Sequence, residues 1–215
     1  MFATDRDLLV IEPALFRDVG FAALVRGRAT GSIASGVLTV SGINLAALGV
    51  DAGSVVLVND VALEVIERLS TTTASVSLLR ASAAAPAIAP ANLASASVVV
   101  PTFAPQIQAA HARLLRAAGL DPQAPEIGGS GATPGEAMIL NTEALRAVEC
   151  LGALEAIYRA ASALGGPDSP EARRADQYAQ RYERELRRTG VVLDLDADGA
   201  PDARRVTGQT RVRRV

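Results

Sequence analysis

The apolar residues of this chain follow one period in its first half and a different period in its second half. Between residues 19 and 100 they recur at every second position or form short β-rich runs, whereas after Pro101 they recur with helical spacing. Side chains alternate between the two faces of a strand, and residues three or four apart share one face of a helix. The two patterns therefore predict a β-rich module joined to a helical part.

The β-rich module contains six candidate strands with short turns between them. The dipeptide Asn59-Asp60 lies between two apolar runs and predicts a tight hairpin turn. Several short strands with Gly- and Ser-rich turns indicate a small antiparallel barrel or sandwich. Residues 81–94, rich in Pro and Ala, are expected to form an extended loop over it. The candidate strands are residues 23–28, 37–40, 55–58, 61–69, 75–80 and 97–100.

Four helices are predicted around this module. The first begins after Thr4, which with Asp7 forms a capping-box-like pair. The second follows Pro101, with Gly119 suited to the left-handed position after its end. Its shared apolar face consists of Ile107, Ala110, Leu114, Leu115 and Ala118. The third covers residues 142–164, and the fourth begins after Ser169 as the capping residue, with Pro170 at the first helical position.

The predicted fold class is α+β, a bundle of about four helices with an inserted small antiparallel β-barrel or sandwich and an extended C-terminal arm. A lone opening helix cannot bury its apolar face, so residues 1–18 are assigned to the helical bundle. Residues 19–100 form the inserted module, residues 101–190 the remainder of the bundle, and residues 191–215 an Asp-Gly turn and basic arm.

The composition excludes several classes of function. A formal net charge of −2 creates no global attraction to nucleic acid or an acidic membrane. The only cysteine, Cys150, rules out an internal disulfide, and the only histidine, His111, lacks the His and Cys partners that a zinc site needs. His111 is expected to have a packing or helix-surface role. We therefore expect no enzyme activity, no cofactor, no signal peptide and no membrane span.

Near the C-terminus, Asp194, Asp196 and Asp198 alternate before Gly199, as in the first half of a calcium-binding loop. Position 12 of such a loop requires a bidentate Glu, and here it is Arg205. The predicted structure is a solvated Asp-Gly turn that reverses the chain, with weak divalent-cation binding, aided by Asp202, as the alternative. The prediction for a metal site is therefore none.

The last twelve residues contain five arginines without an aromatic residue among them. Aromatic side chains are what stack on the bases of single-stranded nucleic acid, so their absence weakens a nucleic-acid interpretation. Docking on an acidic partner by strand addition is favoured, and a disordered tail or nucleic-acid contact are the alternatives. The candidate docking residues are Arg204, Arg205, Arg211, Arg213 and Arg214.

The helical part resembles the head–tail adaptor (connector) proteins of tailed phages and gene transfer agents. The resemblance is carried by three segments, FATDRDLLVIEPALF at the start, the helix run from ALRAVECLGALEAIYRAASAL to RRADQYAQRYERELRR, and VVLDLDADGAPDARR near the end. It covers residues 1–16 and 101–205 and leaves the β-module without a counterpart.

This resemblance implies a non-enzymatic virion neck protein, assembled in the bacterial cytoplasm. It implies a ring, twelve-fold in such adaptors, that joins the portal to a stopper or tail-completion protein and lets DNA pass without sequence-specific binding. The arginines of the tail then become portal-docking residues. Residues on the fourth helix are expected to pack against the next subunit: Ala172, Ala175, Tyr178, Ala179 and Tyr182. The alternatives are a stopper or tail-completion protein, or a β-barrel nucleic-acid-binding module with a helical oligomerisation domain.

Overall fold

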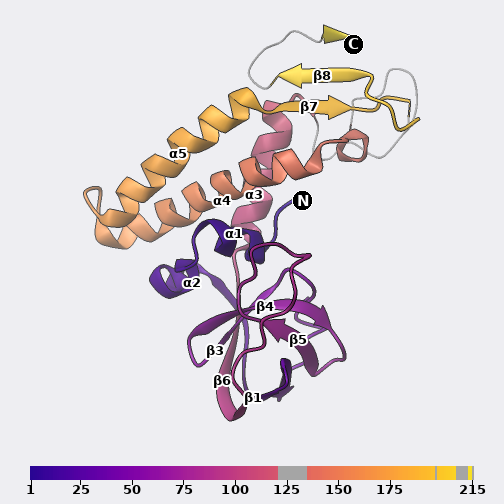
Figure 1. Ribbon diagram of the computed structural model, residues 1–215. Coiled ribbons are helices and arrows are strands. Elements are labelled where there is room, and N and C mark those ends of the chain that lie inside the picture. Colours follow the sequence, from indigo (N-terminus) through magenta and orange to yellow (C-terminus); the bar gives the residue numbers. More distant parts are fainter. Residues whose placement is uncertain (121–134, 197, 207–212, 215) are drawn as a thin grey trace. The chain divides into compact units, whose positions relative to one another are not determined.

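A computed structural model describes residues 1–120, 135–196, 198–206 and 213–214 of the chain (Figure 1). The fold is α+β, with a closed six-stranded antiparallel barrel and five α-helices among the described residues. The chain divides into two compact units. One consists of Thr4–Ala104 and the other of Met1–Ala3 with Pro105–Val215. They are called the barrel unit and the helical unit below.

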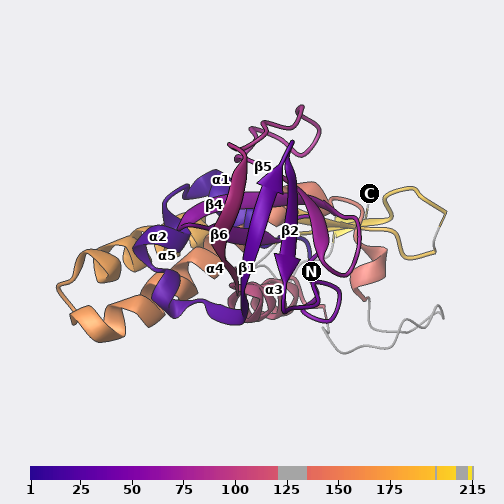
Figure 2. The same cartoon turned by 90° about the horizontal axis from the view of Figure 1, so that it is seen from below.

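The barrel closes through the strand order β1-β2-β5-β4-β3-β6, and every neighbouring pair is antiparallel (Figure 2). Each predicted strand overlaps an observed one, although β1 continues to Ala34, well beyond its predicted end at Arg28. The pairing of β1 with β6 closes the barrel and decides between the two architectures that the sequence left open. The strands are β1 (Leu24–Ala34), β2 (Val37–Ser41), β3 (Val55–Val58), β4 (Val61–Arg68), β5 (Thr73–Ser77) and β6 (Leu93–Thr102).

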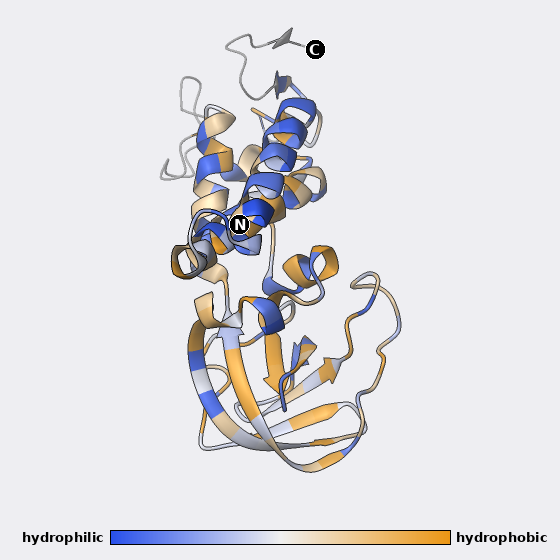
Figure 3. Cartoon of the chain, turned by 90° about the vertical axis from the view of Figure 1, so that its left-hand side faces the viewer, coloured by the Kyte–Doolittle hydropathy of each residue, from blue (hydrophilic) through white to orange (hydrophobic). Residues whose placement is uncertain are grey.

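The interior of the barrel is aliphatic. It is filled by inward-facing residues of all six strands, among them Leu38, Val56, Leu63, Val76 and Val98, each at most 1 % exposed. Figure 3 shows the apolar residues concentrated along these strands. Burial of such side chains stabilises a fold by about 25 cal/mol for each Å² of apolar surface removed from water. The period-two pattern therefore becomes the core of this unit.

Strand β1 pairs on both of its sides, with β2 along one edge and β6 along the other. Its register with β6 shifts between Val25 and Gly27 and again between Gly31 and Ile33. A Cβ atom at Gly31 would lie 2.7 Å from the carbonyl oxygen of Thr39, so no larger residue fits there without moving the backbone. Bulges of this kind bend a strand, and here they allow one long strand to close the barrel.

The turn between β3 and β4 is the one that the sequence predicted. Asn59 and Asp60 both have positive φ, of 46° and 65°, which is the conformation of a two-residue hairpin turn that matches strand twist. The side-chain oxygen of Asn59 also accepts a hydrogen bond from the Ser97 amide of β6 at 2.9 Å. The turn thus fixes the register of β3 with β4 and is itself held by β6.

The first helix lies in the same compact unit as the barrel, whereas the sequence pattern assigned it to the helical bundle. α1 (Asp5–Ile11) and α2 (Leu15–Asp18) lie inside the barrel unit, followed by the short 3₁₀ turn η1 (Gly20–Ala22). The Asp5 carboxylate accepts hydrogen bonds from the Phe103 amide and the Thr102 hydroxyl, both at 2.7 Å. The predicted capping pair does form, with the Thr4 amide donating to Asp7 at 2.9 Å.

A buried ion cluster connects α1 to the barrel wall. The Glu64 carboxylate on β4 is fully buried and accepts from the guanidinium groups of Arg6 and Arg80. Arg80 also donates to the carbonyls of Ala83 at 2.9 Å and Ala85 at 2.7 Å. One carboxylate therefore holds both the opening helix and the loop after β5 on the barrel.

The helical unit is built from α3 (Ala104–Ala117), α4 (Thr142–Gly165) and α5 (Pro170–Arg188), with the 3₁₀ turn η2 (Glu136–Met138) before α4. The predicted start of α5 is confirmed, because the Ser169 hydroxyl accepts from the Ala172 amide at 3.1 Å and Pro170 is the first helical residue. Gly119, with φ +69°, follows the end of α3 as predicted. The predicted helix over residues 142–164 is present, although Leu164 at its end is exposed.

Helix α4 is the central element of this unit, and α5 runs beside it (Figure 1). Gly152 marks a close crossing of three helices. A Cβ atom there would lie 2.9 Å from the Tyr182 ring of α5 and 3.3 Å from the Cβ of Ala110 on α3. Arg113 of α3 lies 4.2 Å above the same Tyr182 ring, within range of a cation–π contact. In the described part of the chain, no helix is both long enough and apolar enough to span a membrane.

Candidate functional site

A three-stranded sheet follows α5, in the order β7-β8-β9. β7 (Gly190–Leu193) and β8 (Ala203–Val206) pair in antiparallel register, and β9 (Arg213–Arg214) pairs with β8. The predicted Asp-Gly turn does reverse the chain, and it connects β7 to β8. The C-terminal arm was expected to extend away from this turn. It begins instead as β8, the second strand of the hairpin.

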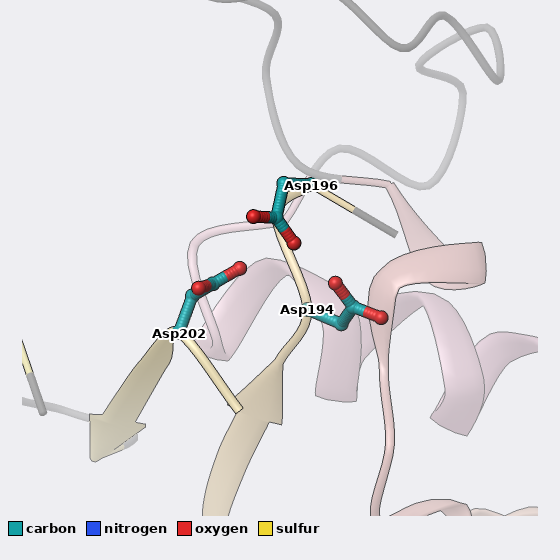
Figure 4. Close-up of side chains that lie close together, drawn as sticks. All are labelled: Asp194, Asp196 and Asp202. Carbon is teal, nitrogen blue, oxygen red and sulfur yellow. The ribbon is translucent and has the colours of Figure 1, made fainter. Parts of the chain in front are cut away.

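The turn brings three carboxylates together. Oxygens of Asp194, Asp196 and Asp202 lie within 4.8 Å of one another, and Figure 4 shows the three side chains grouped around the turn. Asp198, the third residue of the predicted set, is not in this group and instead accepts from the Ala200 amide at 2.7 Å. The third carboxylate is Asp202 because β8 returns it beside the end of β7.

Hydrogen bonds within the turn account for these positions. Asp194 accepts from the Gly199 amide at 2.8 Å, and Asp202 accepts from the Leu195 amide at 2.6 Å. The Asp198 amide donates a hydrogen bond to the Asp196 carboxylate, and this bond favours the ionised carboxylate. Desolvation and the charges of the neighbouring carboxylates outweigh the bond and raise the pKa of Asp196. The three oxygens are of the type that hard divalent cations prefer, and the turn geometry is explained without an ion.

The structure describes the side-chain surroundings of two of the five candidate docking arginines, and these two differ. Arg204 on β8 is exposed. Arg205 is tied into its own chain, because its Nη1 donates to the carbonyl of Gly119 at 2.7 Å, just after the end of α3. Arg213 and Arg214 form the backbone of β9, whereas Arg211 and the side chains of both β9 residues lie outside the described part of the structure.

The candidate subunit-packing residues on α5 face inward. Ala175, Tyr178 and Tyr182 are buried, while Ala172 and Ala179 are half-buried. Tyr178 stacks on Tyr158 of α4, with the ring centroids 5.7 Å apart. This face therefore packs within the chain, and it is the opposite, charged face of α5 that remains exposed.

Sequence reasoning did not identify a buried polar cluster in the helical unit. His111 of α3 lies between two carboxylates, with Nδ1 3.0 Å from Glu149 of α4 and Nε2 2.9 Å from Glu136 of η2. The three residues are up to 38 positions apart in the chain. No local pattern indicates that they meet; the only signal was a Glu within the apolar stripe of the third helix.

Comparisons of this chain with protein-family models, curated proteins and solved structures find no match, so its function has to be argued from its residues and their geometry.

Proposed function

We propose that this protein is a structural, non-enzymatic adaptor of a virion neck, which forms a ring between the portal and a stopper or tail-completion protein. The proposal starts from the resemblance of residues 1–16 and 101–205 to head–tail adaptors of phages and gene transfer agents. Its proposed location is therefore the virion neck, with DNA passing through the ring.

The observation that carries the proposal is the outer face of α5. The apolar face of this helix is used by its own chain, whereas its exposed face carries both signs of charge. The exposed polar and charged residues are Arg173, Asp176, Gln177, Gln180, Arg181, Glu183, Arg184, Arg187 and Arg188. A shallow groove on the second half of the helix is lined by Gln180, Glu183, Arg184, Arg187 and Arg188.

A ring of identical subunits needs two different patches on each copy that fit each other. Charged groups at the rim of an interface set orientation and partner choice more than affinity. The mixed charges of α5 suit one such patch. Because Ala175, Tyr178 and Tyr182 are buried within the chain, the subunit contact is assigned to the charged side of α5 and not to these three residues.

The portal-docking role is now assigned to four of the five candidate arginines. Arg204 is exposed, and we propose that it acts with Arg211, Arg213 and Arg214. Arg205 instead holds β8 against the end of α3, where a cation also interacts favourably with the helix dipole.

The rival interpretation, a nucleic-acid-binding barrel, finds little support in the strand sequences. None of the six barrel strands contains Phe, Tyr or Trp. Barrels that bind single strands combine aromatic stacking platforms with a basic groove. The structural role is therefore the better supported of the two.

The test is to mix the purified protein with its cognate portal and to image the complex by negative-stain electron microscopy. We expect an added ring on the portal with the wild-type chain and none after deletion of residues 206–215, with circular dichroism showing that the helices of the shortened chain remain folded. The variant Arg184→Glu/Arg187→Glu is expected to leave isolated subunits on the portal without a closed ring. If the folded wild-type protein adds no density to the portal, the proposal fails.

A further inference from the structure

The first three residues of the chain form a short strap, Met1–Ala3, that belongs to the helical unit and not to the barrel unit that begins at Thr4. Its backbone is bound at several points. The amides of Phe2 and Ala3 donate to the two carboxylate oxygens of Glu149, at 3.1 and 3.3 Å. The carbonyl of Phe2 accepts from Nε of Arg146 at 2.9 Å.

Glu149 is the centre of this attachment. Its side chain is fully buried in the middle of α4. A buried carboxylate is stable only where donors replace the water that it has lost. The donors here are the two strap amides and Nδ1 of His111, so the strap and the histidine share one carboxylate.

The position of His111 determines its protonation state. Both ring nitrogens lie within hydrogen-bond distance of a carboxylate, Nδ1 of Glu149 and Nε2 of Glu136. An ionised carboxylate can only accept a hydrogen bond, and a neutral imidazole has only one N–H. Both contacts are satisfied together when the ring is the doubly protonated imidazolium ion.

The surrounding charges favour that ion. Burial disfavours the charged ring, but the hydrogen bonds and charge of Glu149, with the hydrogen bond of Glu136, outweigh it and raise the pKa of His111. The other charged groups beside the cluster are the amino group of Met1, 2.6 Å from Glu136, and the guanidinium of Arg146, which also pairs with Glu143 at 2.8 Å. Phe2 adds an edge-on ring contact to His111, with centroids 4.9 Å apart.

We propose that His111 is a proton-operated latch for the strap. With both nitrogens protonated, it bridges Glu149 and Glu136 and keeps Glu149 in place to bind the amides of Phe2 and Ala3. When the ring loses one proton to solvent, a nitrogen lone pair faces a carboxylate oxygen at about 3 Å. That contact becomes repulsive. The Glu149 carboxylate then loses the His111 donor or its alignment with the strap amides, and the strap detaches from α4.

The chain offers a direct measurement, because His111 is its only histidine. The NMR signal of the ring C–H protons follows the protonation of this one residue, and protection factors for hydrogen exchange at Phe2 and Ala3 follow the strap in the same samples. We expect the two transitions to share a midpoint above the ordinary pKa of histidine, with protection about tenfold lower on the alkaline side. Protection factors divide out the intrinsic dependence of exchange on pH.

Three variants complete the test. His111→Gln has no titrating ring, so strap protection should be low and should no longer change across this pH range. Glu136→Gln removes one charge and should lower the midpoint for both His111 and the strap. Glu155→Gln is the matched control, since Glu155 pairs with Arg113 between the same two helices without touching the cluster, and both midpoints should stay unchanged.

Two results would overturn the latch. One is strap protection that stays constant while His111 titrates in the folded wild-type protein. The other is a His111 midpoint at or below the ordinary value. Neither result depends on the assembly of subunits into a ring on the portal. The latch and the proposed function can therefore fail separately.

Discussion

At the scale of single residues, Glu64 is expected to contribute strongly to stability. Its carboxylate is the shared partner of Arg6 and Arg80 and is fully buried. Removing one partner of a buried ion cluster typically costs about 3–5 kcal/mol, because the remaining charges are left without compensation. We expect Glu64→Gln to lower the free energy of unfolding by about that amount in urea denaturation. Glu67→Gln, at an exposed position of the same strand, should change it little.

Two tyrosines of the helical unit form a matched pair for a second prediction. The hydroxyl of Tyr182 is buried and has no hydrogen-bond partner among the described residues, whereas that of Tyr158 accepts from Arg174 at 2.8 Å. An unpaired buried polar group carries a desolvation cost that its removal recovers. Tyr182→Phe is therefore expected to be neutral or stabilising, and Tyr158→Phe to cost about 1 kcal/mol. Thermal unfolding of the two variants checks which of them is more stable. A Tyr158→Phe variant more stable than Tyr182→Phe would contradict the hydrogen bonding assigned to the two hydroxyls.

At the scale of elements, the crossing of α3, α4 and α5 depends on the absence of a side chain at Gly152. A methyl group there would lie 2.9 Å from the Tyr182 ring, which is closer than packed carbon atoms approach. Overpacking of this kind costs about 1–3 kcal/mol, and the better helix propensity of Ala recovers about 1 kcal/mol. We expect Gly152→Ala to be destabilising in the wild-type background by denaturant titration. In a Tyr182→Leu background the closest obstacle, the Tyr182 ring, is gone, and the same substitution should cost less.

The elements themselves were predicted well where their signals are local. The six strands, the Asn59-Asp60 turn, the Ser169 cap and Gly119 after α3 are all present. Each depends on backbone preferences or hydrogen bonds among residues a few positions apart. The short helix α2 was not predicted, since four residues after Pro13 show no helical period.

At the scale of the whole molecule, stability should depend on pH through the cluster around His111. The folded-state pKa of His111 is raised, so its contribution is fully present below the ordinary histidine pKa and is lost as pH rises through the raised value. Burial disfavours ionisation of Glu136, but the Met1 amino group and His111 outweigh it and lower its pKa. The contribution of Glu136 is therefore present above the ordinary Glu value and is lost as pH falls through the lowered one.

Together these two shifts place the largest contribution at about pH 5–6, between the ordinary pKa values of Glu and His. We expect the urea midpoint of the wild type to be higher at about pH 5.5 than at about pH 8, and this difference to shrink in His111→Gln. Equal changes with pH in the two proteins would assign the pH dependence to other groups.

The sequence by itself determined where the six barrel strands and helices α1, α3, α4 and α5 lie and that the chain is α+β, because alternation, helical spacing and caps act between near neighbours. The tertiary structure decided the rest: that β1 pairs with β6 to close a barrel, that α1 joins the barrel, that Asp202 replaces Asp198 in the acidic turn, and that Glu149 meets His111 and the strap. Phe2 and Glu149, for example, are 147 positions apart. Contacts at such separations depend on how whole elements bury their faces, and no pattern within a single element records them.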